Sequence, residues 1–336
     1  MLGHPFGCPA FFKKSIPFFA EWCIIGESEE AIFLEALINQ LFVLYIFIAL
    51  GWGLGLIKKD LGSKSSILSY LLANLFFPCK IFLNFATNFT TEYVETNYPT
   101  LFISVGILAV LVAMGHMIPK MLTKDAYERK VYNYSTSISN YAYFGYVLVE
   151  SVLGPAAQNN IMVFCIPFSI YCYTFGVAML LNRDSSIKSL FNTITVAIAL
   201  GIVWGLLKLP LPDVVRTVMK NASSCVGPIS MVLVGLALST FTVRQLLPNF
   251  SVILFCGIRL MLVPAVVYGI CKGLSLVMTL PEAVYPSAVL MACMPCGLNT
   301  VVFPRMLGRD CSLGAKLILL SSLLACVSIP FWLNVI

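Results

Sequence analysis

The sequence predicts an all-α, multi-pass membrane protein whose ten transmembrane helices form two inverted repeats of five. Composition is the first observation: of 336 residues, 59% are hydrophobic and 11% are charged, whereas a soluble domain carries about 25% charged residues. The second is a series of ten apolar runs, each of a length that crosses a bilayer. The third is an internal similarity between the two halves of the chain at a shift of about 150 residues.

The ten apolar runs, of about 20 residues each, set the expected domain organisation. The first five are Ala36–Ile57, Ser66–Ala86, Thr100–Pro119, Tyr132–Leu153 and Ile161–Leu181. The second five are Ile187–Leu207, Ala222–Phe241, Phe250–Leu276, Ala283–Phe303 and Gly314–Asn334. Every loop between them is short, so no soluble domain fits. We therefore expect an N-terminal extension over 1–34, a first repeat over 35–182 and a second repeat over 183–336.

The N-terminal extension is a poor match to a signal peptide, because Pro17 and Glu21 interrupt the apolar part that follows Lys13 and Lys14. Its aromatic residues around the two lysines are compatible with a segment that lies along the membrane surface. A partly ordered terminal extension is the alternative, and the sequence leaves both open.

Lysine and arginine set the expected orientation. Thirteen of them lie in the odd-numbered loops and six on the other side. The positive-inside rule then places the odd-numbered loops in the cytoplasm and both termini outside. Because topology accounts for the basic residues, the net charge of +6 does not indicate a nucleic-acid partner.

The end of the first run, ALGWGLGLIK (Ala49–Lys58), recurs in the sixth run as ALGIVWGLLK (Ala199–Lys208). Further matches follow in the same order, including Pro78 with Pro228 and Gly106 with Gly257. Five spans are an odd number, so the second repeat enters the membrane upside down relative to the first. Inverted repeats of this kind are typical of secondary transporters, which bind substrate near the midplane at broken helices.

Helix-breaking residues lie in the middle of two matching runs. The ninth run contains MPCGLNT (Met294–Thr300), with Pro295, Gly297 and Asn299; the fourth contains Asn140, Tyr141 and Gly145. Broken backbone at membrane depth is tolerated only where it is buried in protein or lines a cavity. We therefore expect the two asparagines to frame a polar substrate site. The alternatives are an interhelical hydrogen bond for each asparagine and a simple kink at Pro295.

Ionisable residues inside a membrane are costly and are functional candidates. Lys80, in the second run, is expected to attract an anion, with a side chain that extends to the interface as the alternative. Arg259 is expected to form a structural ion pair or to lie at an interface. The C-x-x-C pair, Cys293 and Cys296, lacks a partner pair, so these cysteines are expected to be structural. No metal or cofactor is predicted.

Four stretches, in this order, resemble the auxin efflux carrier family, which includes plant PIN-type carriers and bacterial malate and malonate permeases. They are LGWGLGLIKKDLG near the first run, GPISMVLVGLAL (Gly227–Leu238), GIRLMLVPAVV (Gly257–Val267) and MPCGLNTVVFPRMLGRD in the ninth. The resemblance implies that helices four and nine cross at the substrate site. It also implies a transport domain of helices 3–5 and 8–10, a scaffold of helices 1, 2, 6 and 7, and organic anions as substrates.

Two positions depart from the family pattern. Val147 stands where the family has a proline, so the fourth helix is expected to bend at Gly145 instead. Thr300 stands where plant carriers have a proline, which argues against auxin itself, and Asn299 is closer to the bacterial pattern.

These observations predict a secondary transporter, an efflux carrier or permease, for a small organic anion such as a dicarboxylate or an aromatic carboxylate. The alternatives are a carrier similar to the bile-acid/sodium symporters and a non-transporting receptor or sensor with this fold. An enzyme is not expected, because the two histidines have no Asp pair or metal-ligand spacing near them. The expected partners are the anion, the lipid bilayer and, in a homodimer, a second copy of this chain. The membrane is expected to be a plasma membrane or bacterial inner membrane, with the endoplasmic reticulum as an alternative.

Overall fold

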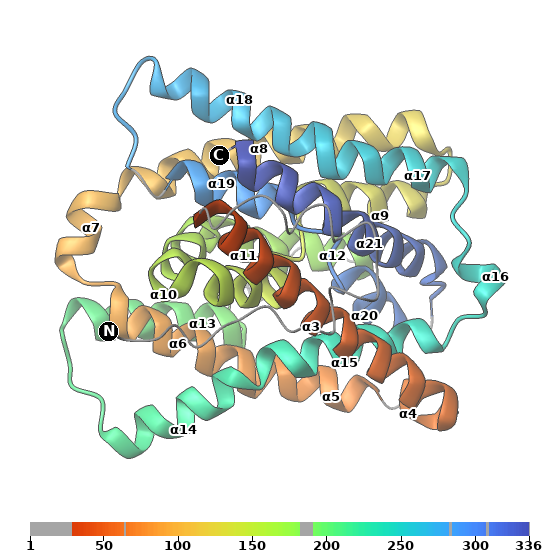
Figure 1. The fold of residues 1–336 in the computed structure, drawn as a ribbon, viewed down its shortest axis with the longest axis horizontal. Coiled ribbons are helices and arrows are strands. Elements are labelled where there is room, and N and C mark those ends of the chain that lie inside the picture. The colour runs from red at the N-terminus through yellow and green to blue at the C-terminus, as the bar shows by residue number, and fades with distance from the viewer. Residues whose placement is uncertain (1–28, 64, 182–190, 282–283, 307–308, 336) are drawn as a thin grey trace.

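The computed structural model describes residues 29–63, 65–181, 191–281, 284–306 and 309–335, and these are helical with no β-strand among them. The long helices run side by side along the length of the molecule (Figure 1). Most of the expected N-terminal extension lies outside the described residues. Its expected end at residue 34 remains a prediction; the first described helix begins at Glu29, and its membrane-spanning part begins at Leu37.

The first half of the chain forms helices and short π-helical segments, written η. They are α3 (Glu29–Ile57), α4 (Lys59–Ser63), α5 (Ser65–Leu71), η2 (Leu72–Phe76), α6 (Phe77–Asn88), α7 (Thr91–Asn97), α8 (Pro99–Leu122), α9 (Ala126–Ser137), η3 (Tyr141–Gly145), α10 (Tyr146–Phe164), α11 (Ile166–Tyr171), η4 (Cys172–Gly176) and α12 (Val177–Leu181).

The second half continues in the same manner. Its elements are α13 (Thr193–Leu206), α14 (Asp213–Ser224), α15 (Val226–Ser239), α16 (Val243–Leu246), α17 (Phe250–Gly257), η6 (Ile258–Leu262), α18 (Val263–Ser275), α19 (Val284–Cys293), α20 (Asn299–Met306) and α21 (Ser312–Val335).

Within the described residues, six helices are long and apolar enough to cross a membrane, and one pair bent by 51° makes a seventh if counted as one span. The six coincide with the first, second, third, seventh, eighth and tenth expected spans. They are Leu37–Ile57, Ser65–Asn88, Pro99–Leu122, Asp213–Ser239, Phe250–Ser275 and Ser312–Val335. The sixth and ninth expected spans coincide with the shorter apolar helices α13 and α19. A multi-pass membrane protein is therefore confirmed, while the count of ten remains a prediction.

Gly154 separates the fourth and fifth expected spans. Helix α10 runs through this region, but Gly154 has φ 85° and ψ 176°, which breaks the helical path one residue after the expected end of the fourth span. Glycine adopts this positive φ without steric cost. Pro155, which follows, lacks the N–H that would continue the helical hydrogen bonds.

Two pairs of helices are packed through glycine. In the pair α3–α15, a Cβ added to Gly51 would lie 2.2 Å from the carbonyl oxygen of Val232, and one added to Gly235 would lie 2.0 Å from that of Ile48. In the pair α6–α13, a Cβ added to Gly205 would lie 2.6 Å from the carbonyl oxygen of Phe85. Small residues let membrane helices approach this closely. These two pairs, α3–α15 and α6–α13, are called the glycine-packed pairs below.

A proline in the membrane leaves a carbonyl without its helical donor, and the structure shows how one such group is satisfied. Pro264 lacks the N–H that would bond to Leu260 four residues earlier, and the helix opens into the π-helical segment η6 just before it. The indole Nε1 of Trp332 on α21 donates to that carbonyl oxygen at 2.9 Å. Helix α21 is thereby joined to η6 by a polar contact that the bilayer could not provide.

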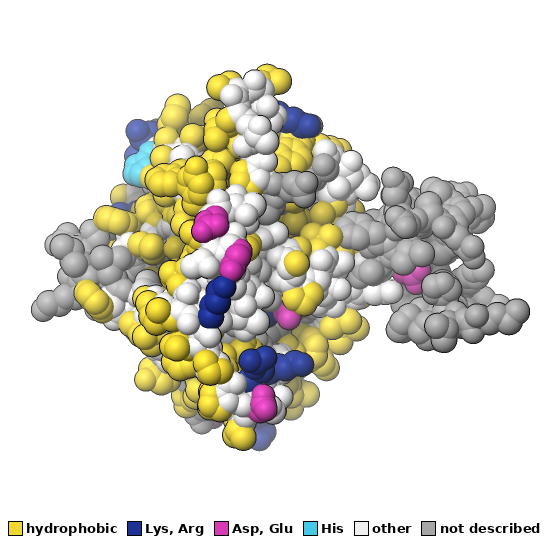
Figure 2. All heavy atoms as spheres, turned by 90° about the vertical axis from the view of Figure 1, so that its left-hand side faces the viewer, with side chains coloured by type: hydrophobic (Ala, Val, Ile, Leu, Met, Phe, Trp, Pro, Cys, Tyr) yellow, Lys and Arg dark blue, Asp and Glu magenta, His cyan; other side chains and the backbone are white. Residues whose placement is uncertain are grey.

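Charged side chains gather at one end of the molecule (Figure 2). Helices α4 and α16 lie at one end, and α7 and α14 reach the other (Figure 1). Figure 2 looks onto the second end and shows acidic and basic side chains gathered down its middle, with hydrophobic side chains on both sides. There Lys208 Nζ lies 2.5 Å from Glu92 Oε1, and this hydrogen bond is the main reason that the pKa of Glu92 is lowered to about 2.

Candidate functional site

The two expected breaks meet in the structure. Helix α9 ends at Ser137 and η3 begins at Tyr141, while α19 ends at Cys293 and α20 begins at Asn299. Between them, Ser139 and Cys296 form an antiparallel bridge, and the Asn140 N–H donates to the Pro295 carbonyl oxygen at 2.8 Å. The backbone groups freed by each break are therefore satisfied by the other break, as burial at membrane depth requires. This juxtaposition is called the crossing below.

Neighbouring side chains hold the crossing in place. Ser139 Oγ donates to the carbonyl oxygen of Met291 on α19 at 2.7 Å, and the Cys296 N–H donates to Ser321 Oγ on α21 at 3.0 Å. Both hydroxyls replace helical partners that the broken backbone has lost. The crossing is thus tied to α19 and α21, and its extended residues have a fixed position.

The expectation that Gly145 bends the fourth helix is wrong. Its φ of −63° and ψ of −49° are helical, and the break lies earlier, from Ile138 to Asn140. Gly145 instead allows a close approach, since an added Cβ would lie 3.2 Å from Met294 Cγ. In the other broken segment, between α19 and α20, Pro295 interrupts the helix because it cannot donate a backbone hydrogen bond.

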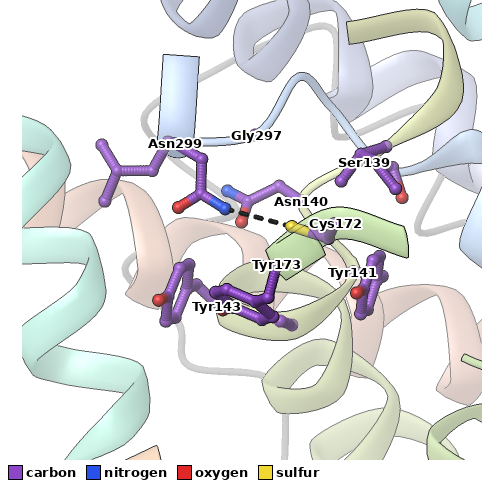
Figure 3. Close-up of a pocket in the computed structure, with 11 residues that line it drawn as sticks. Ser139, Asn140, Tyr141, Tyr143, Cys172, Tyr173, Gly297 and Asn299 are labelled. Atoms are coloured by element: carbon purple, nitrogen blue, oxygen red, sulfur yellow. Dashed lines mark hydrogen bonds between the residues drawn. The ribbon is translucent and has the colours of Figure 1, made fainter. Parts of the chain in front are cut away.

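A small cavity lies at the crossing (Figure 3). Its volume is about 10 Å³, which is about the room that one water molecule needs. Of the predicted site residues, Asn140, Tyr141, Gly297 and Asn299 line it, whereas Gly145, Pro295 and Lys80 do not. The lining residues are Ile138, Ser139, Asn140, Tyr141, Ala142, Tyr143, Cys172, Tyr173, Gly297, Leu298 and Asn299.

The two asparagines differ in their hydrogen bonds. Asn299 Nδ2 donates to the Tyr134 hydroxyl at 2.8 Å, with Cys172 Sγ at 3.6 Å, so it makes the interhelical bond expected of a structural asparagine. Asn140 is 4% exposed and lines the cavity, which its side chain faces (Figure 3). No described residue forms a hydrogen bond with its amide, which can both donate and accept, so Asn140 has unused hydrogen-bonding capacity at the cavity.

The tyrosines near the break are mainly packed against their neighbours. The Tyr141 hydroxyl lies 3.1 Å from Ser169 Oγ, and its ring centroid lies 5.7 Å from that of Tyr146. Tyr143 packs against Phe77 of α6, with centroids 5.3 Å apart. Tyr141 and Tyr143 also line the cavity, whereas Tyr146 does not.

Lys80 lies on α6 and makes an ion pair away from the cavity. Its Nζ is 2.7 Å from Glu150 Oε2, and Gln158 Nε2 donates to the same oxygen at 2.6 Å. Lys80 is 5% exposed, and the Glu150 side chain is 44% exposed. Charge-assisted hydrogen bonds are the stronger kind, so this cluster joins α6 to α10 and neutralises the charge that was expected to attract an anion. That role for Lys80 remains a prediction.

Arg259 is 1% exposed and lies behind the crossing. It donates to the carbonyl oxygen of Ala292, near the C-terminal end of α19, where a positive charge complements the helix dipole. The expected ion pair is not found, because no carboxylate of the described residues lies within 4 Å of it. Its Nε has no hydrogen-bond partner among them.

Several residues of the site were not predicted, namely Tyr134, Ser139, Cys172 and Tyr173. A signal was present for Tyr134, which lies in the segment Val131–Ser137 of α9. This segment is buried throughout, although four of its seven residues are polar in addition to its two tyrosines. A polar stretch in an apolar chain marks a helix that faces other helices rather than lipid. Cys172 and Tyr173 gave no such signal, because only the packing of η4 brings them to the crossing.

Comparison with known proteins agrees with the structure. A family model described as "Membrane transport protein" matches residues 36–189 and residues 177–333. No curated protein matches the chain. Members of this family are transporters, and the six long apolar helices agree with a multi-pass protein of the membrane. Because the matches extend over most of the sequence, the chain belongs to this family of membrane transport proteins, the auxin efflux carrier family.

Proposed function

We propose that this chain is a secondary transporter for small organic anions, carboxylates in particular, which bind at the crossing and are moved by alternating access. The observation that carries the proposal is the pairing of two broken segments through their backbones, with the unpaired Asn140 amide facing the cavity between them. Transporters with inverted repeats bind substrate at such broken helices.

The electrostatics of the crossing favour an anion. The helical segments that begin at Tyr141 and at Asn299 both start at the cavity. Helix N-termini carry partial positive charge and unpaired N–H groups, which bind anions without a full cation. No carboxylate is among the residues that line this cavity, so nothing described there repels a carboxylate. The Asn140 amide can donate to it.

The small volume of the cavity supports a mechanism in which the crossing must open. A cavity of about 10 Å³ cannot hold even a small dicarboxylate, so the structure represents a closed state. Binding then requires that the segments on the two sides of the crossing move apart. Such a motion is what alternating access provides, when one bundle rocks against another.

The glycine-packed pairs support the inverted repeat. Helix α3 packs on α15 through Gly51 and Gly235, and α13 packs on α6 through Gly201 and Gly205. At the shift of about 150 residues in the sequence, Gly51 corresponds to Gly201, and Pro78 of α6 corresponds to Pro228 of α15. The first helix of each half therefore packs on the second helix of the other half. Reciprocal contacts of this kind are what a two-fold relation between the halves would produce.

Two alternatives lead to different expectations. A sodium-coupled carrier would need carboxylate or other oxygen ligands at the crossing. No carboxylate is among the described residues that line the cavity there, and Glu150 of α10 is paired with Lys80. A receptor or sensor with this fold would bind a ligand without moving it. We also expect no enzymatic activity, because the described residues contain no metal-binding cluster of His, Cys, Asp or Glu and the crossing has no base beside a nucleophile.

The test is charge movement in proteoliposomes on a solid-supported membrane, with malate, malonate, citrate and indole-acetate-like carboxylates as the panel. We expect currents with one class in the wild type. Asn140→Ala should abolish them without loss of folded protein, while Asn221→Ala, at an exposed asparagine, should leave them unchanged. Wild-type protein that is folded but silent across the panel would contradict an anion carrier. Currents that survive in Asn140→Ala would place the site elsewhere.

A further inference from the structure

A second, larger cavity lies away from the crossing. Its volume is about 420 Å³, and it is lined by Ala126, Tyr127, Lys130, Arg309 and Asp310. These residues come from the first turns of α9 and from the segment between α20 and α21. This space is called the vestibule below. It has room for a small carboxylate, whereas the closed crossing does not.

The vestibule and the crossing lie at opposite ends of the same two helical segments. Helix α9 leads from the vestibule to the first break, and α20 leads from the second break back toward the vestibule. The two helices contact each other, and Asn299 of α20 bonds to Tyr134 of α9. Lys130 precedes Asn140 by ten residues, and Arg309 follows Asn299 by ten. Lys130 lies seven residues before the end of α9 at Ser137, which is roughly 10 Å along the helix axis at 1.5 Å per residue.

Among the described residues that line the vestibule, two are cations, Lys130 and Arg309, and one is a carboxylate, Asp310. The Asp310 carboxylate accepts hydrogen bonds from the Ser312 N–H at 2.9 Å and from Ser312 Oγ at 2.7 Å, so it is engaged in capping the start of α21. The Arg309 guanidinium carbon lies 5.5 Å from the centroid of the Tyr127 ring. A ring contact of this kind uses the face of the guanidinium and orients it, and its edge N–H groups still match a carboxylate in a two-bonded arrangement.

We infer that the vestibule is a second anion site, at which a small di- or tricarboxylate is held by Arg309 and Lys130 before it enters the crossing or after it leaves. This inference rests on the proposed function, since it assigns an entry step to the same substrate. The charges of the described lining residues sum to one positive charge, and a positive site raises the local concentration of an anionic ligand and its association rate. Arg309 and Lys130 are then positioning residues, because they act on the substrate away from the closed crossing.

The test uses the same proteoliposome currents, with Arg309→Gln, Lys130→Gln and the double variant. We expect the substrate concentration for half-maximal current to rise about tenfold in the double variant, while the current at saturating substrate stays unchanged. The dependence of that concentration on salt should also weaken, because screening acts on the charges that were removed. Arg309→Lys should restore most of the wild-type value. Lys208→Gln, at the opposite end of the molecule, should have no effect.

The outcomes separate the two proposals. Wild-type currents that are lost in Asn140→Ala but show unchanged half-saturation in the double variant would overturn the vestibule site and leave the proposed function standing. A fall in saturating current with no change in half-saturation would also overturn it, because the cations would then support the structure rather than collect substrate. A folded wild type that carries no current would overturn both.

Discussion

The glycine-packed pairs and the crossing both bring backbones from the two halves of the chain together, but by opposite means. In α3–α15, unbroken helices approach so closely that a Cβ on Gly235 would meet the carbonyl oxygen of Ile48 at 2.0 Å. At the crossing, both helices are interrupted, and their backbones bond to each other through Asn140 and Pro295.

The difference shows what a substrate site in a membrane requires. An unbroken helix satisfies its own backbone N–H and C=O groups, so the backbones of the glycine-packed pairs offer a substrate no free polar group. A break frees such groups and can bind a polar ligand, but only if the surrounding protein satisfies the remainder. The hydroxyls of Ser139 and Ser321 do so here. The unbroken pairs therefore stabilise the fold, while the broken pair has the groups that recognition needs.

The largest effect is expected from filling a glycine in the unbroken pairs. Gly235→Leu should prevent folding, because overpacking costs about 1–3 kcal/mol where side chains can shift, and here the obstacle is backbone. Gly53→Leu is the matched control on α3, since no atom lies within 4 Å of its added Cβ. Size-exclusion chromatography of detergent-solubilised protein should show aggregate for the first variant and a single peak for the second. A wild-type profile for Gly235→Leu would disprove the close packing of α3 and α15.

A smaller effect is expected at the Lys80–Glu150 pair, which joins α6 of one glycine-packed pair to α10 beside the crossing. Glu150→Leu leaves a buried ammonium without its carboxylate. Breaking a fully buried pair costs about 3–5 kcal/mol, and because the Glu150 side chain is 44% exposed we expect about 2 kcal/mol. The double variant Lys80→Met/Glu150→Leu should recover most of this. Thermal unfolding in detergent measures the stability of the single and the double variant. Glu92→Gln, which breaks the exposed Lys208–Glu92 pair, is the control. A double variant no more stable than Glu150→Leu would contradict the pairing.

The smallest and most diagnostic effect separates the two asparagines of the crossing. Asn299→Leu should lower stability by about 1 kcal/mol, because it breaks a hydrogen bond and leaves the Tyr134 hydroxyl with one partner fewer. Asn140→Leu should leave the melting temperature unchanged or raise it, since it removes a buried amide that has no partner, while it abolishes transport. Melting curves and currents from the same preparations test this trade between stability and function. Equal destabilisation by both variants would mean that Asn140 is a structural residue as well.

Much of the fold could be predicted because hydropathy is a local property. The ends of α8 and of the α17–α18 span lie within three residues of the expected ends of the third and eighth runs. The break in the ninth run was also predicted, since Pro295 cannot donate and Gly297 relaxes the backbone wherever they occur. In the fourth run, Asn140 and Gly145 were both named as helix-breaking residues; the break lies at Ile138–Asn140 and so includes only the first, because no proline marks its exact position.

The sequence by itself determined that this chain is a multi-pass membrane transport protein, where its long apolar helices lie, and that Asn140 and Asn299 lie at breaks in two of its helices. Only the tertiary structure decided what each residue does there. The bond between Asn299 and Tyr134 joins positions 165 residues apart, and the Lys80–Glu150 pair joins positions 70 apart. The physical reason is that a polar group in a membrane takes whichever partner the packing of distant helices provides. Among the described residues, the same packing brings no hydrogen-bond partner to the Asn140 amide.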